Sequence, residues 1–431
     1  MDKKVLILIG IVFIILIIAG AATAFFLFKQ TGPVTLTYWG LWEPESVFSE
    51  VISDYERTHP KVKVKYQKAS PIQYRERMMT AISKDGGPDI VRIHNSWLPM
   101  LKNSLQAAPT NVFPAEEFQK TFYPVASADF VADGRVWAVP LEIDTLAMYV
   151  NEDVIRAGGV AVPTTWEEFS PVASRLTVRD SAGRIQTAGT SLGGAANVDH
   201  WQEILGLMTL QATTQTGASV NAGNSQAAVE AMQFYTSFES IDRDWDETLD
   251  ASTLAFGNGK VGFYFGPSWR YFDIKDISQG KVNFSVAPVP QLTGGTTVNF
   301  ATYWAEAVSK KSPHGKEAFE FLKYLSSKEV LTKLYAAETS IRGFGEPYSR
   351  VDMASLLATD PVGSVVISQA PTAKSWYLAG YTNDGETGIN SKVGKYYLDA
   401  VNAVNQGSEV AKVMETVAAG LAQVLGSYGI R

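Results

Sequence analysis

Two carboxylates, Glu142 and Asp144, lie in a polar island between two short apolar runs, residues 136–141 and 146–150. Both runs have the length of buried strands, and one β/α pattern precedes them while another follows. We therefore interpret the stretch as a strand that leaves one lobe, a crossing, and a strand that enters the next lobe. Such a crossing forms the floor of a cleft, where small ligands bind. The alternative is an ordinary strand–turn–strand with solvated acids.

Aromatic residues recur in the loops that would border this cleft, close to polar side chains. Aromatic rings stack on apolar ligand faces, while amides, hydroxyls and carboxylates pair with a polar rim. A pyranose has apolar C–H faces and a rim of hydroxyls, so this combination suits it. The aromatic candidates are Trp42, Trp97, Trp201, Trp269, Tyr303, Trp304 and Trp376, and the polar candidates are Glu43, His94, Asn95, Ser96, Glu142, Asp144, Asn197 and Ser268.

The composition argues against several other kinds of chemistry. The chain of 431 residues has no cysteine, which excludes a disulfide framework, a thiolate metal site and a cysteine nucleophile. Its four histidines lack HxxxH or HExxH spacing, so we expect no metal site of that kind. The net charge of −7 argues against nucleic acid as a partner, because binding phosphates requires a basic surface. No GxGxxG or GxxxxGK[ST] motif occurs, and we expect no cofactor.

An uncharged apolar run, residues 5–28, follows the short N-terminal end, residues 1–4. The run exceeds the roughly 20 residues that span a hydrocarbon core. Two lysines in the end would keep residues 1–4 in the cytoplasm and place the rest of the chain outside. We therefore expect one transmembrane anchor followed by a tether at residues 29–33. The alternative is a signal peptide cleaved near Ala24, which would release a secreted or periplasmic protein.

Strand and helix patterns alternate from residue 34 onward. Strand patterns cover residues 34–39, 62–66 and 89–93, and helical patterns cover residues 47–55 and 71–83. This order predicts a mainly parallel sheet with helices on both faces. Ligands bind beyond the carboxyl ends of such strands, which here are residues 39–43 and 93–97. A second crossing is predicted at residues 282–290, where an alternating stretch ends in prolines.

Several short motifs, each weak alone, occur in one order and spacing across residues 34–425. They are 87–91 with Trp97, 136–140 through 148–153, 163–168, 256–262 with 266–269, and 287–290 followed by 316–325. In this arrangement the chain resembles the extracellular solute-binding proteins of ABC importers. Within that group it is most similar to the sugar-binding family typified by maltodextrin-binding protein.

The resemblance implies a two-lobed α/β fold of the type II periplasmic-binding-protein kind, preceded by one N-terminal transmembrane helix. Each lobe would be a mainly parallel sheet flanked by helices. The first lobe would comprise residues 34–140 plus 290–335, and the second would comprise residues 145–286 plus 345–431. The hinge crossings would lie near residues 140–144, 286–290 and 335–345.

The resemblance also implies a function without enzymatic activity. The chain would be the substrate-binding component of an ABC-type importer. It would capture an extracellular carbohydrate between its lobes and deliver it, by lobe closure, to the transmembrane subunits of a permease. The number of stacking candidates favours an oligosaccharide over a monosaccharide. We expect a monomer at the extracytoplasmic face of a bacterial or archaeal plasma membrane, held there by residues 5–28.

Two family aromatics carry over to this sequence. In the family, a loop of the second lobe carries an aromatic residue shortly after a glycine, and the matching residue here is Trp269. The family also has an aromatic residue before a C-terminal helix, and the matching residue here is Trp376. The family often has an acid just after the third strand, where this chain has residues 94–96 (His-Asn-Ser), so the sugar's identity stays open. The family's lipid-attachment cysteine is also missing, and the apolar segment 5–28 can replace it as a tether.

Other functions stay open at this point. A glycan hydrolase or lyase would pair Glu142 with Asp144 or Glu43, because glycosidases need two carboxylates across a sugar-binding cleft. However, residues two apart at a crossing tend to point the same way or into different lobes. A sensing protein or an adhesion lectin would share the same binding chemistry. A binding protein for a peptide, polyamine, iron or phosphorylated polyol would need more acids, or Tyr and His clusters, in these loops.

We predict that Trp269→Ala weakens carbohydrate binding more than Ser268→Ala. A micromolar ligand needs about 8 kcal/mol of net binding free energy. Hydrogen bonds at about 1 kcal/mol net each hardly supply that amount, so ring stacking must contribute much of it. Isothermal titration calorimetry of both variants measures the difference, and near-native affinity in Trp269→Ala would contradict the prediction.

Overall fold

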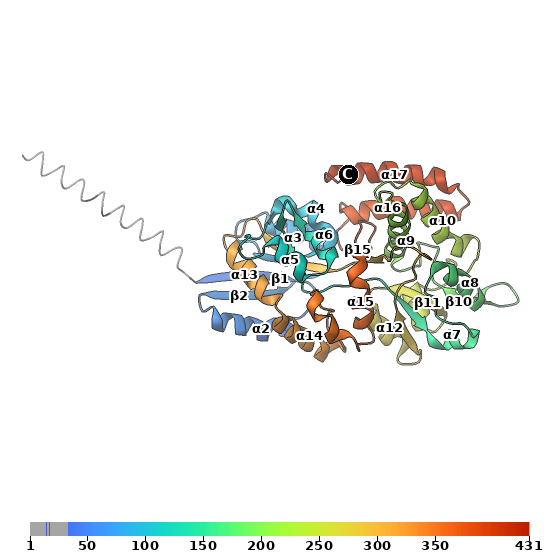
Figure 1. The fold of residues 1–431 in the computed structure, drawn as a ribbon, viewed down its shortest axis with the longest axis horizontal. Helices are drawn as coiled ribbons and strands as arrows, with labels where there is room; N and C mark the ends of the chain where they lie inside the picture. The colour runs from blue at the N-terminus through green and yellow to red at the C-terminus, as the bar shows by residue number, and fades with distance from the viewer. Residues whose placement is uncertain (1–13, 15–16, 18–32, 431) are drawn as a thin grey trace, which may run out of the picture.

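Two α/β lobes lie side by side in the computed structural model, which describes residues 14, 17 and 33–430 (Figure 1). Each lobe has its own main sheet and its own cluster of buried apolar side chains. No helix among the described residues is long and apolar enough to cross a membrane. The predicted anchor, residues 5–28, falls outside the described part of the chain except at Ile14 and Ile17.

The first lobe is built on a sheet with the strand order β2-β1-β3-β14-β4, and β7 also pairs with β14. These strands are β1 (Val34–Gly40), β2 (Val62–Lys68), β3 (Ile90–His94), β4 (Leu105–Gln106), β7 (Ala138–Val139) and β14 (Trp304–Ser309). A small hairpin of β5 (Val131–Ala132) and β6 (Arg135–Val136) precedes β7.

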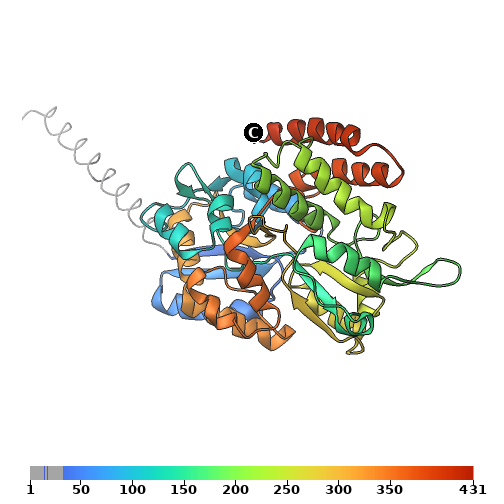
Figure 2. The same cartoon turned by 45° about the vertical axis from the view of Figure 1, so that its right-hand side comes forward.

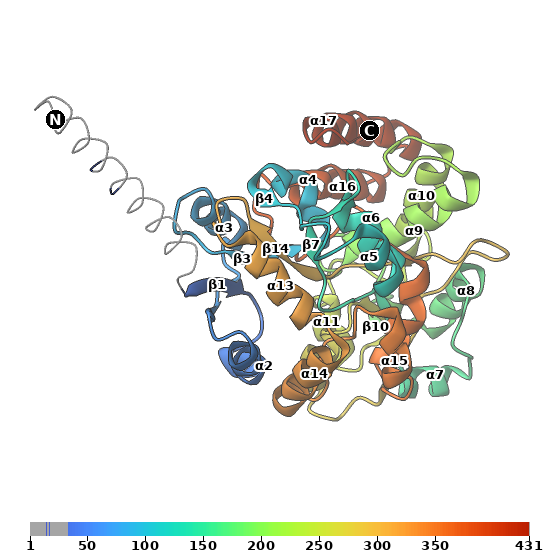
Figure 3. The same ribbon diagram turned by 60° about the vertical axis from the view of Figure 1, so that its left-hand side comes forward.

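Helices cover the first sheet (Figure 3). They are α2 (Glu45–Thr58), α3 (Tyr74–Ile82), α4 (Leu98–Leu101), α5 (Ala115–Thr121), α6 (Pro124–Phe130), α13 (Gly315–Leu325) and α14 (Lys328–Arg342). The sequence explains their packing: in α2, Val47, Phe48, Val51 and Tyr55 recur at helical spacing and are all buried. In the neighbouring β2, buried residues alternate with exposed ones, as a half-buried strand requires.

The second lobe is built on a sheet with the strand order β12-β8-β11-β10-β9. These strands are β8 (Ala147–Asn151), β9 (Val178–Arg179), β10 (Ile185–Thr190), β11 (Val261–Gly266) and β12 (Phe284–Ala287). The surrounding helices are α7 (Glu152–Gly158), α8 (Trp166–Leu176), α9 (Trp201–Thr216), α10 (Gln226–Ser240), α11 (Ser252–Gly257), α12 (Arg270–Ser278), α16 (Ile389–Asn405) and α17 (Val410–Ser427). The last two pack side by side at the C-terminal end of the lobe (Figure 2).

The sheets are mixed, so the prediction of mainly parallel sheets was wrong. The pairs β1–β2, β1–β3 and β10–β11 are parallel, whereas β14 is antiparallel to β3, β4 and β7, and β8 is antiparallel to β11 and β12. The reason is topological. Strand β14 begins opposite the end of β3, and β8 begins opposite the end of β11. A strand that enters a lobe at the edge where its neighbour ends must run in the opposite direction.

The chain passes between the lobes more than once. Strand β7 belongs to the first sheet and β8 to the second, so residues 140–146 connect them. The chain leaves the second sheet after Ala287 and rejoins the first at Trp304. Between these points β13 (Asn299–Phe300) pairs with β15 (Ala373–Lys374), which follows α15 (Gly363–Gln369). The crossing at residues 142–144 contacts Glu43 after β1 through Arg92, Ser268 after β11, and Trp304 at the start of β14, so these segments lie where the two lobes meet.

The predicted lobe boundaries stay a prediction. The sequence assigned residues 345–431 to the second lobe, but Tyr348, Met353 and Leu357 lie in the apolar cluster of the first. A side chain of α15 braces the crossings: Gln369 donates hydrogen bonds to Thr145 and to the Leu146 carbonyl, 2.9 Å each, and accepts one of 2.9 Å from the Val289 backbone.

We predict opposite effects for two glycine-to-alanine changes in the second lobe. At Gly189 in β10, an added Cβ would lie 1.8 Å from the Ala173 carbonyl oxygen of α8. Because this oxygen belongs to the backbone, only a movement of the helix or the strand could relieve the clash. Gly189→Ala should therefore cost at least about 1–3 kcal/mol of unfolding free energy. At Gly394 in α16, a Cβ meets nothing within 4 Å. Gly394→Ala should stabilise by up to about 1 kcal/mol, because alanine is the better helix former.

Thermal unfolding followed by circular dichroism compares both glycine variants with the unmodified chain. An equal melting temperature for Gly189→Ala and Gly394→Ala would contradict the predicted packing of α8 on β10.

Candidate ligand-binding site

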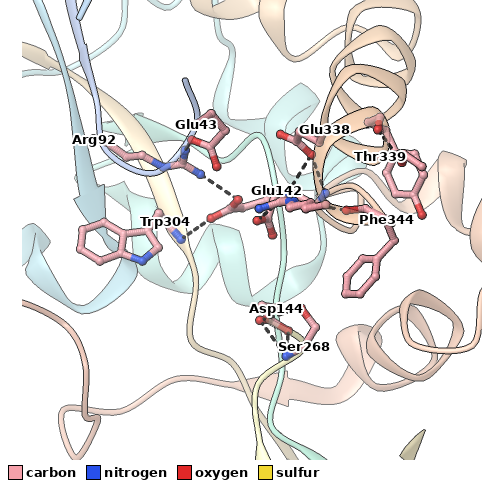
Figure 4. A network of polar contacts seen from close by, with 12 residues as sticks. Glu43, Arg92, Glu142, Asp144, Ser268, Trp304, Glu338, Thr339 and Phe344 are labelled. Carbon is pink, nitrogen blue, oxygen red and sulfur yellow. Dashed lines mark hydrogen bonds and ion pairs between the residues drawn. The ribbon is translucent and has the colours of Figure 1, made fainter. Parts of the chain in front are cut away.

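A buried arginine organises the first-lobe side of the crossing (Figure 4). Arg92 in β3 forms ion pairs with Glu43, which follows β1, and with Glu142 in the crossing, the latter at 2.7 Å. Its Nε lies 3.6 Å from a carboxylate oxygen of Glu306 in β14. All four side chains are almost completely buried, and the Trp304 N–H also donates to Glu142 at 3.2 Å. These carboxylates therefore hold the loop after β1, the crossing and β14 in one arrangement.

More carboxylates gather next to Arg92. Glu338 of α14 accepts a hydrogen bond of 2.6 Å from the backbone of Glu346, and Arg342 bridges both acids at 3.2 and 2.7 Å. Burial raises the pKa of Glu306 to about 7 and that of Glu338 to about 8. Burial also raises the pKa of Glu142 well above its usual value, against the opposing effect of Arg92. One oxygen each from Glu43, Glu142 and Glu346 lies within 4.8 Å of the others, a spacing that a metal ion can use.

Asp144 faces the second lobe, although it lies only two residues from Glu142. It accepts hydrogen bonds from the Ser268 backbone N–H, at 3.1 Å, and from the Ser268 hydroxyl, at 3.0 Å. Burial, followed by repulsion from Glu346, raises the pKa of Asp144 to about 8. The crossing thus binds first-lobe atoms through Glu142 and second-lobe atoms through Asp144.

Three indole rings form a cluster on the first lobe beside Glu142. Trp42 meets Trp304 edge to face, with centroids 5.8 Å apart, and Trp304 meets Trp97 in the same way at 5.3 Å. Trp97 is fully buried and Trp304 is 9% exposed, whereas Trp42 is half-buried. Of the three rings, Trp42 has the most surface open to solvent, and the other two support it.

A second aromatic group lies on the second lobe, next to Ser268. The guanidinium carbon of Arg270 lies 4.3 Å from the ring centre of Trp269 and 4.7 Å from that of Tyr381. Arg270 also donates to His200 Nε2 at 2.8 Å, and the Tyr381 hydroxyl donates to Asp199 at 2.6 Å. Trp269 is half-buried and Tyr381 is 51% exposed, so both rings retain open surface on a platform fixed by Arg270.

Polar contacts join the two lobes near these rings. Arg75 of α3 donates to the Asp384 carbonyl at 2.7 Å, and the Asn390 amide of α16 donates to the Ser96 hydroxyl at 2.7 Å. Asp129 of α6 accepts bonds from Asn95, at 3.1 Å, and from the Tyr303 hydroxyl, at 2.7 Å. Asp129 also accepts a bond from Ser375.

The structure separates the predicted site residues into two groups. Trp42, Glu43, Glu142, Asp144, Trp269 and Trp304 lie at the edges where the lobes meet, whereas Asn95, Ser96, Trp97, Asn197, Trp201, Tyr303 and Trp376 hold internal or supporting positions. The Asn197 amide donates to two backbone carbonyls at 3.0 Å, and Trp376 is 4% exposed with its ring against Tyr397. A ligand-binding role for any of these residues stays a prediction.

Sequence reasoning missed Arg92, Arg270 and Tyr381. Arg92 sits in an apolar strand pattern that carries no sign of its three acidic neighbours. Arg270 directly follows Trp269 and could have been considered with it. Tyr381 has a positive φ of 54°, a conformation that the sequence does not reveal.

A sizeable cavity lies elsewhere on the molecule. It has about 710 Å³ and is lined by residues of α6, the end of α9 and the segment 371–375. Its lining residues include Thr213, Thr214 and Lys374 but no aromatic residue. A cavity without aromatic rings does not match the stacking chemistry of the predicted site.

Residues 40–331 match the family described as bacterial extracellular solute-binding protein. The chain belongs to this family. An uncharacterized lipoprotein of Streptomyces antibioticus is 24% identical over 341 residues, covering 70% of this chain and 69% of the relative. The multiple sugar-binding protein of Streptococcus mutans is 22% identical over 330 residues, covering 71% and 74%.

A solved structure of the cyclic alpha-maltosyl-1,6-maltose binding protein from Arthrobacter globiformis has the same fold as this solute-binding protein. It aligns with a TM-score of 0.74 at 18% identity, covering 92% of this chain and 100% of the other. The expected two-lobed α/β fold is therefore confirmed. Membership of an extracellular solute-binding family also agrees with the expected location outside the cytoplasm, and its members are binding proteins.

We predict that His94 makes the folded protein sensitive to acid. His94 is buried at the end of β3, with its ring nitrogens 2.8 Å from the Ser96 hydroxyl and 3.0 Å from the Thr302 hydroxyl. Burial lowers its pKa from 6.5 to about 3. Below pH 6.5 the unfolded chain therefore binds a proton that the folded protein does not. The stability contributed by the neutral His94 should therefore fall as the pH falls, by about 2 kcal/mol near pH 5, whereas buried acids with raised pKa values, such as Asp144, act in the opposite direction.

Urea unfolding between about pH 5 and 7 tests the role of His94, with the pH range chosen around the ordinary histidine pKa. His94→Gln keeps a polar side chain but removes the titrating ring, so it should lose less stability on acidification than the unmodified protein. His59→Gln, at an exposed position, is the matched control. Equal acid sensitivity of His94→Gln and the unmodified protein would contradict the prediction.

Proposed function

We propose that this solute-binding protein captures an extracellular carbohydrate between its lobes and delivers it to an ABC-type permease. The observation that carries the proposal is the arrangement around the crossing. Glu142 binds the Trp304 backbone beside the half-buried Trp42, while Asp144 binds Ser268 beside the half-buried Trp269. Partly open rings on both lobes thus flank the crossing, as stacking on two faces of a sugar requires.

The polar groups near the rings suit hydroxyl recognition. Asp199, Asp144 and Ser268 offer acceptors and a hydroxyl, and Arg270 offers N–H donors beside Trp269 and Tyr381. Several stacking rings favour an oligosaccharide over a monosaccharide. The Streptococcus relative is a multiple sugar-binding protein, and the Arthrobacter structure is of a cyclic alpha-maltosyl-1,6-maltose binding protein. Both names support a carbohydrate over a peptide, polyamine or iron.

Lobe closure would couple binding to delivery. Side-chain hydrogen bonds hold α3 and the Asn95–Trp97 turn to residues 384–390, which lead into α16; among them are Arg75 to Asp384 and Asn390 to Ser96. Such bonds can form or break as the lobes rotate about the crossings. Closing around a ligand would present both lobes to the transmembrane subunits together.

A hydrolytic role is disfavoured by the state of the carboxylates. Glu142 and Glu43 are both held by Arg92, and Asp144 is held by Ser268. Paired in this way, the three acids are not placed as an acid and a nucleophile on either side of a glycosidic bond. A sensing protein or an adhesion lectin would use the same binding site and is the remaining alternative.

Further parts of the proposal concern assembly and location. We propose that residues 5–28 anchor the chain at the outer face of the plasma membrane, that the protein acts as a monomer, and that the lobes divide near residues 140–144, 286–290 and 335–345. Cleavage near Ala24 would instead give a free protein. Mass spectrometry of the mature N-terminus distinguishes the two outcomes.

The test is a binding screen with the full chain against mono- and oligosaccharides, peptides and polyols. A ligand that binds the native state raises the melting temperature in proportion to RT ln(1 + [L]/Kd). We expect a shift with an oligosaccharide class and no product on prolonged incubation. Shifts with peptides or polyols alone would contradict the carbohydrate assignment, and product formation would revive the hydrolase.

For the sugar that binds, Trp42→Ala should raise Kd by about 10-fold or more, because it removes the first-lobe stacking face. Trp137→Ala is the matched control: Trp137 is also half-buried on the first lobe, but its ring lies over Lys102 and its N–H donates to the Ala132 carbonyl. Equal affinities of the two variants, measured by titration calorimetry, would contradict a role for Trp42.

A further inference from the structure

We propose that Glu43, Glu142 and Glu346 form a site for a divalent cation, with Ca²⁺ as the fitting ion, beside the crossing between β7 and β8. This assignment goes beyond carbohydrate capture and does not depend on it. The three ligands come from different parts of the chain: the loop after β1, the crossing between β7 and β8, and the segment after α14. Figure 4 shows Glu43, Glu142 and Glu338 around the same space beside Arg92.

The spacing of the oxygens matches calcium. One carboxylate oxygen from each residue lies within 4.8 Å of the other two. Two ligands of one ion can be no further apart than twice the metal–oxygen distance. Calcium binds oxygen at about 2.3–2.6 Å and tolerates irregular geometry, whereas magnesium needs about 2.0–2.1 Å in a near-ideal octahedron. Oxygens brought this close from irregular positions suit calcium, whose coordination is flexible, better than magnesium, which demands a near-ideal octahedron.

One carboxylate oxygen of the site has no partner. Glu43 is 3% exposed, and its Oε1 finds no hydrogen-bond donor among the described residues, although its Oε2 pairs with Arg92. Glu142 uses one oxygen for Arg92 and the other for the Trp304 N–H, at 3.2 Å. A carboxylate oxygen has lone pairs for a further ligand. A buried charged oxygen left without a partner is costly, and an ion in this position would satisfy it.

The local charge also calls for a cation. Glu43, Glu142, Glu306, Glu338 and Glu346 surround two guanidinium groups, those of Arg92 and Arg342. The acidic groups therefore outnumber the guanidinium groups in a largely buried region, and every acid that is ionised there needs a partner or a metal. A cavity of about 20 Å³ lies among Glu43, Glu142, Glu338 and Glu346, which is room for one small ion or one water molecule.

The donor set selects the class of ion. All ligands are carboxylate oxygens, and neither a thiolate nor an imidazole is among them. Hard cations prefer such oxygens, whereas zinc and copper favour nitrogen and sulfur. A bound ion would link Glu346, in the segment after α14, to Glu142 of the crossing and to Glu43 of the loop after β1. It would thereby fix the crossing relative to the first sheet.

The experiment uses the full chain, treated with EDTA and then freed of chelator. Addition of CaCl2 to about 100 times Kd should raise the melting temperature by several degrees, and EDTA should reverse the shift. MgCl2 should produce a smaller shift. Terbium, which replaces calcium at oxygen sites, should show luminescence sensitised by tryptophan, because Trp42 directly precedes Glu43 and its ring meets that of Trp304, whose backbone N–H donates to Glu142. Calcium should compete this signal away.

Variants locate the site. Glu346→Gln removes one ligand from a half-buried position and should weaken calcium binding on the order of 10-fold or more. Glu116→Gln, an 81% exposed carboxylate on α5, makes the same change of charge and should leave calcium binding unchanged. The terbium signal of the unmodified chain tests the site even if Glu346→Gln folds poorly.

Two outcomes would overturn the proposal. Absence of a calcium-dependent shift and of sensitised luminescence in the unmodified chain would mean that protons, rather than an ion, neutralise the excess acids. A shift that Glu346→Gln retains in full would place the bound ion elsewhere. Because these readouts contain no sugar, their failure leaves the carbohydrate proposal untouched, and failure of the sugar screen leaves the cation site untouched.

Discussion

The buried guanidinium of Arg92 is the constraint on which the rest of the site depends. It sits in β3, in the middle of the first sheet, and attracts Glu43, Glu142 and Glu306 from three other segments. Removing one partner of a buried ion pair costs about 3–5 kcal/mol, because the other charge is left uncompensated. Arg92 therefore fixes the loop that carries Trp42 and the strand that starts at Trp304, and with them the first-lobe face of the candidate site.

The contacts that join segments around Arg92 fall into two groups, those that fix the crossings and those that can break when the lobes move. Gln369 joins two crossings through three hydrogen bonds in a buried setting, and Asp129 ties α6 to residues of three other segments. The contacts near α16 are different, because each reaches across through a single side chain: Arg75 to the Asp384 carbonyl, and the buried Asn390 to the Ser96 hydroxyl. The crossings are thus fixed by several hydrogen bonds, while the contacts near α16 depend on single side chains. This arrangement suits a protein that must both close on a ligand and release it.

Local patterns predicted the elements well but not the partners of individual side chains. The strands at residues 34–39 and 62–66 and the crossing beside Glu142 follow from periodicity, since these signals are contained in neighbouring residues. Strand direction was mispredicted because β14 joins β3 from about 200 residues away. Among the site residues, Trp269 and Trp376 looked equivalent in sequence, yet one is half-buried beside Arg270 and the other packs in a core. Burial of that kind depends on distant segments.

The position of β14 also sets an order of assembly. This strand lies between β3 and β4 in the first sheet, yet it follows the whole of the second sheet in the chain. As synthesis proceeds, β3 has no neighbour on that side until residues 304–309 emerge, so the first lobe cannot be completed before the second lobe's strands exist. Long-range pairing of this kind slows folding. A nascent chain that stays incomplete for so long remains open to a secretion machinery that accepts only unfolded polypeptide.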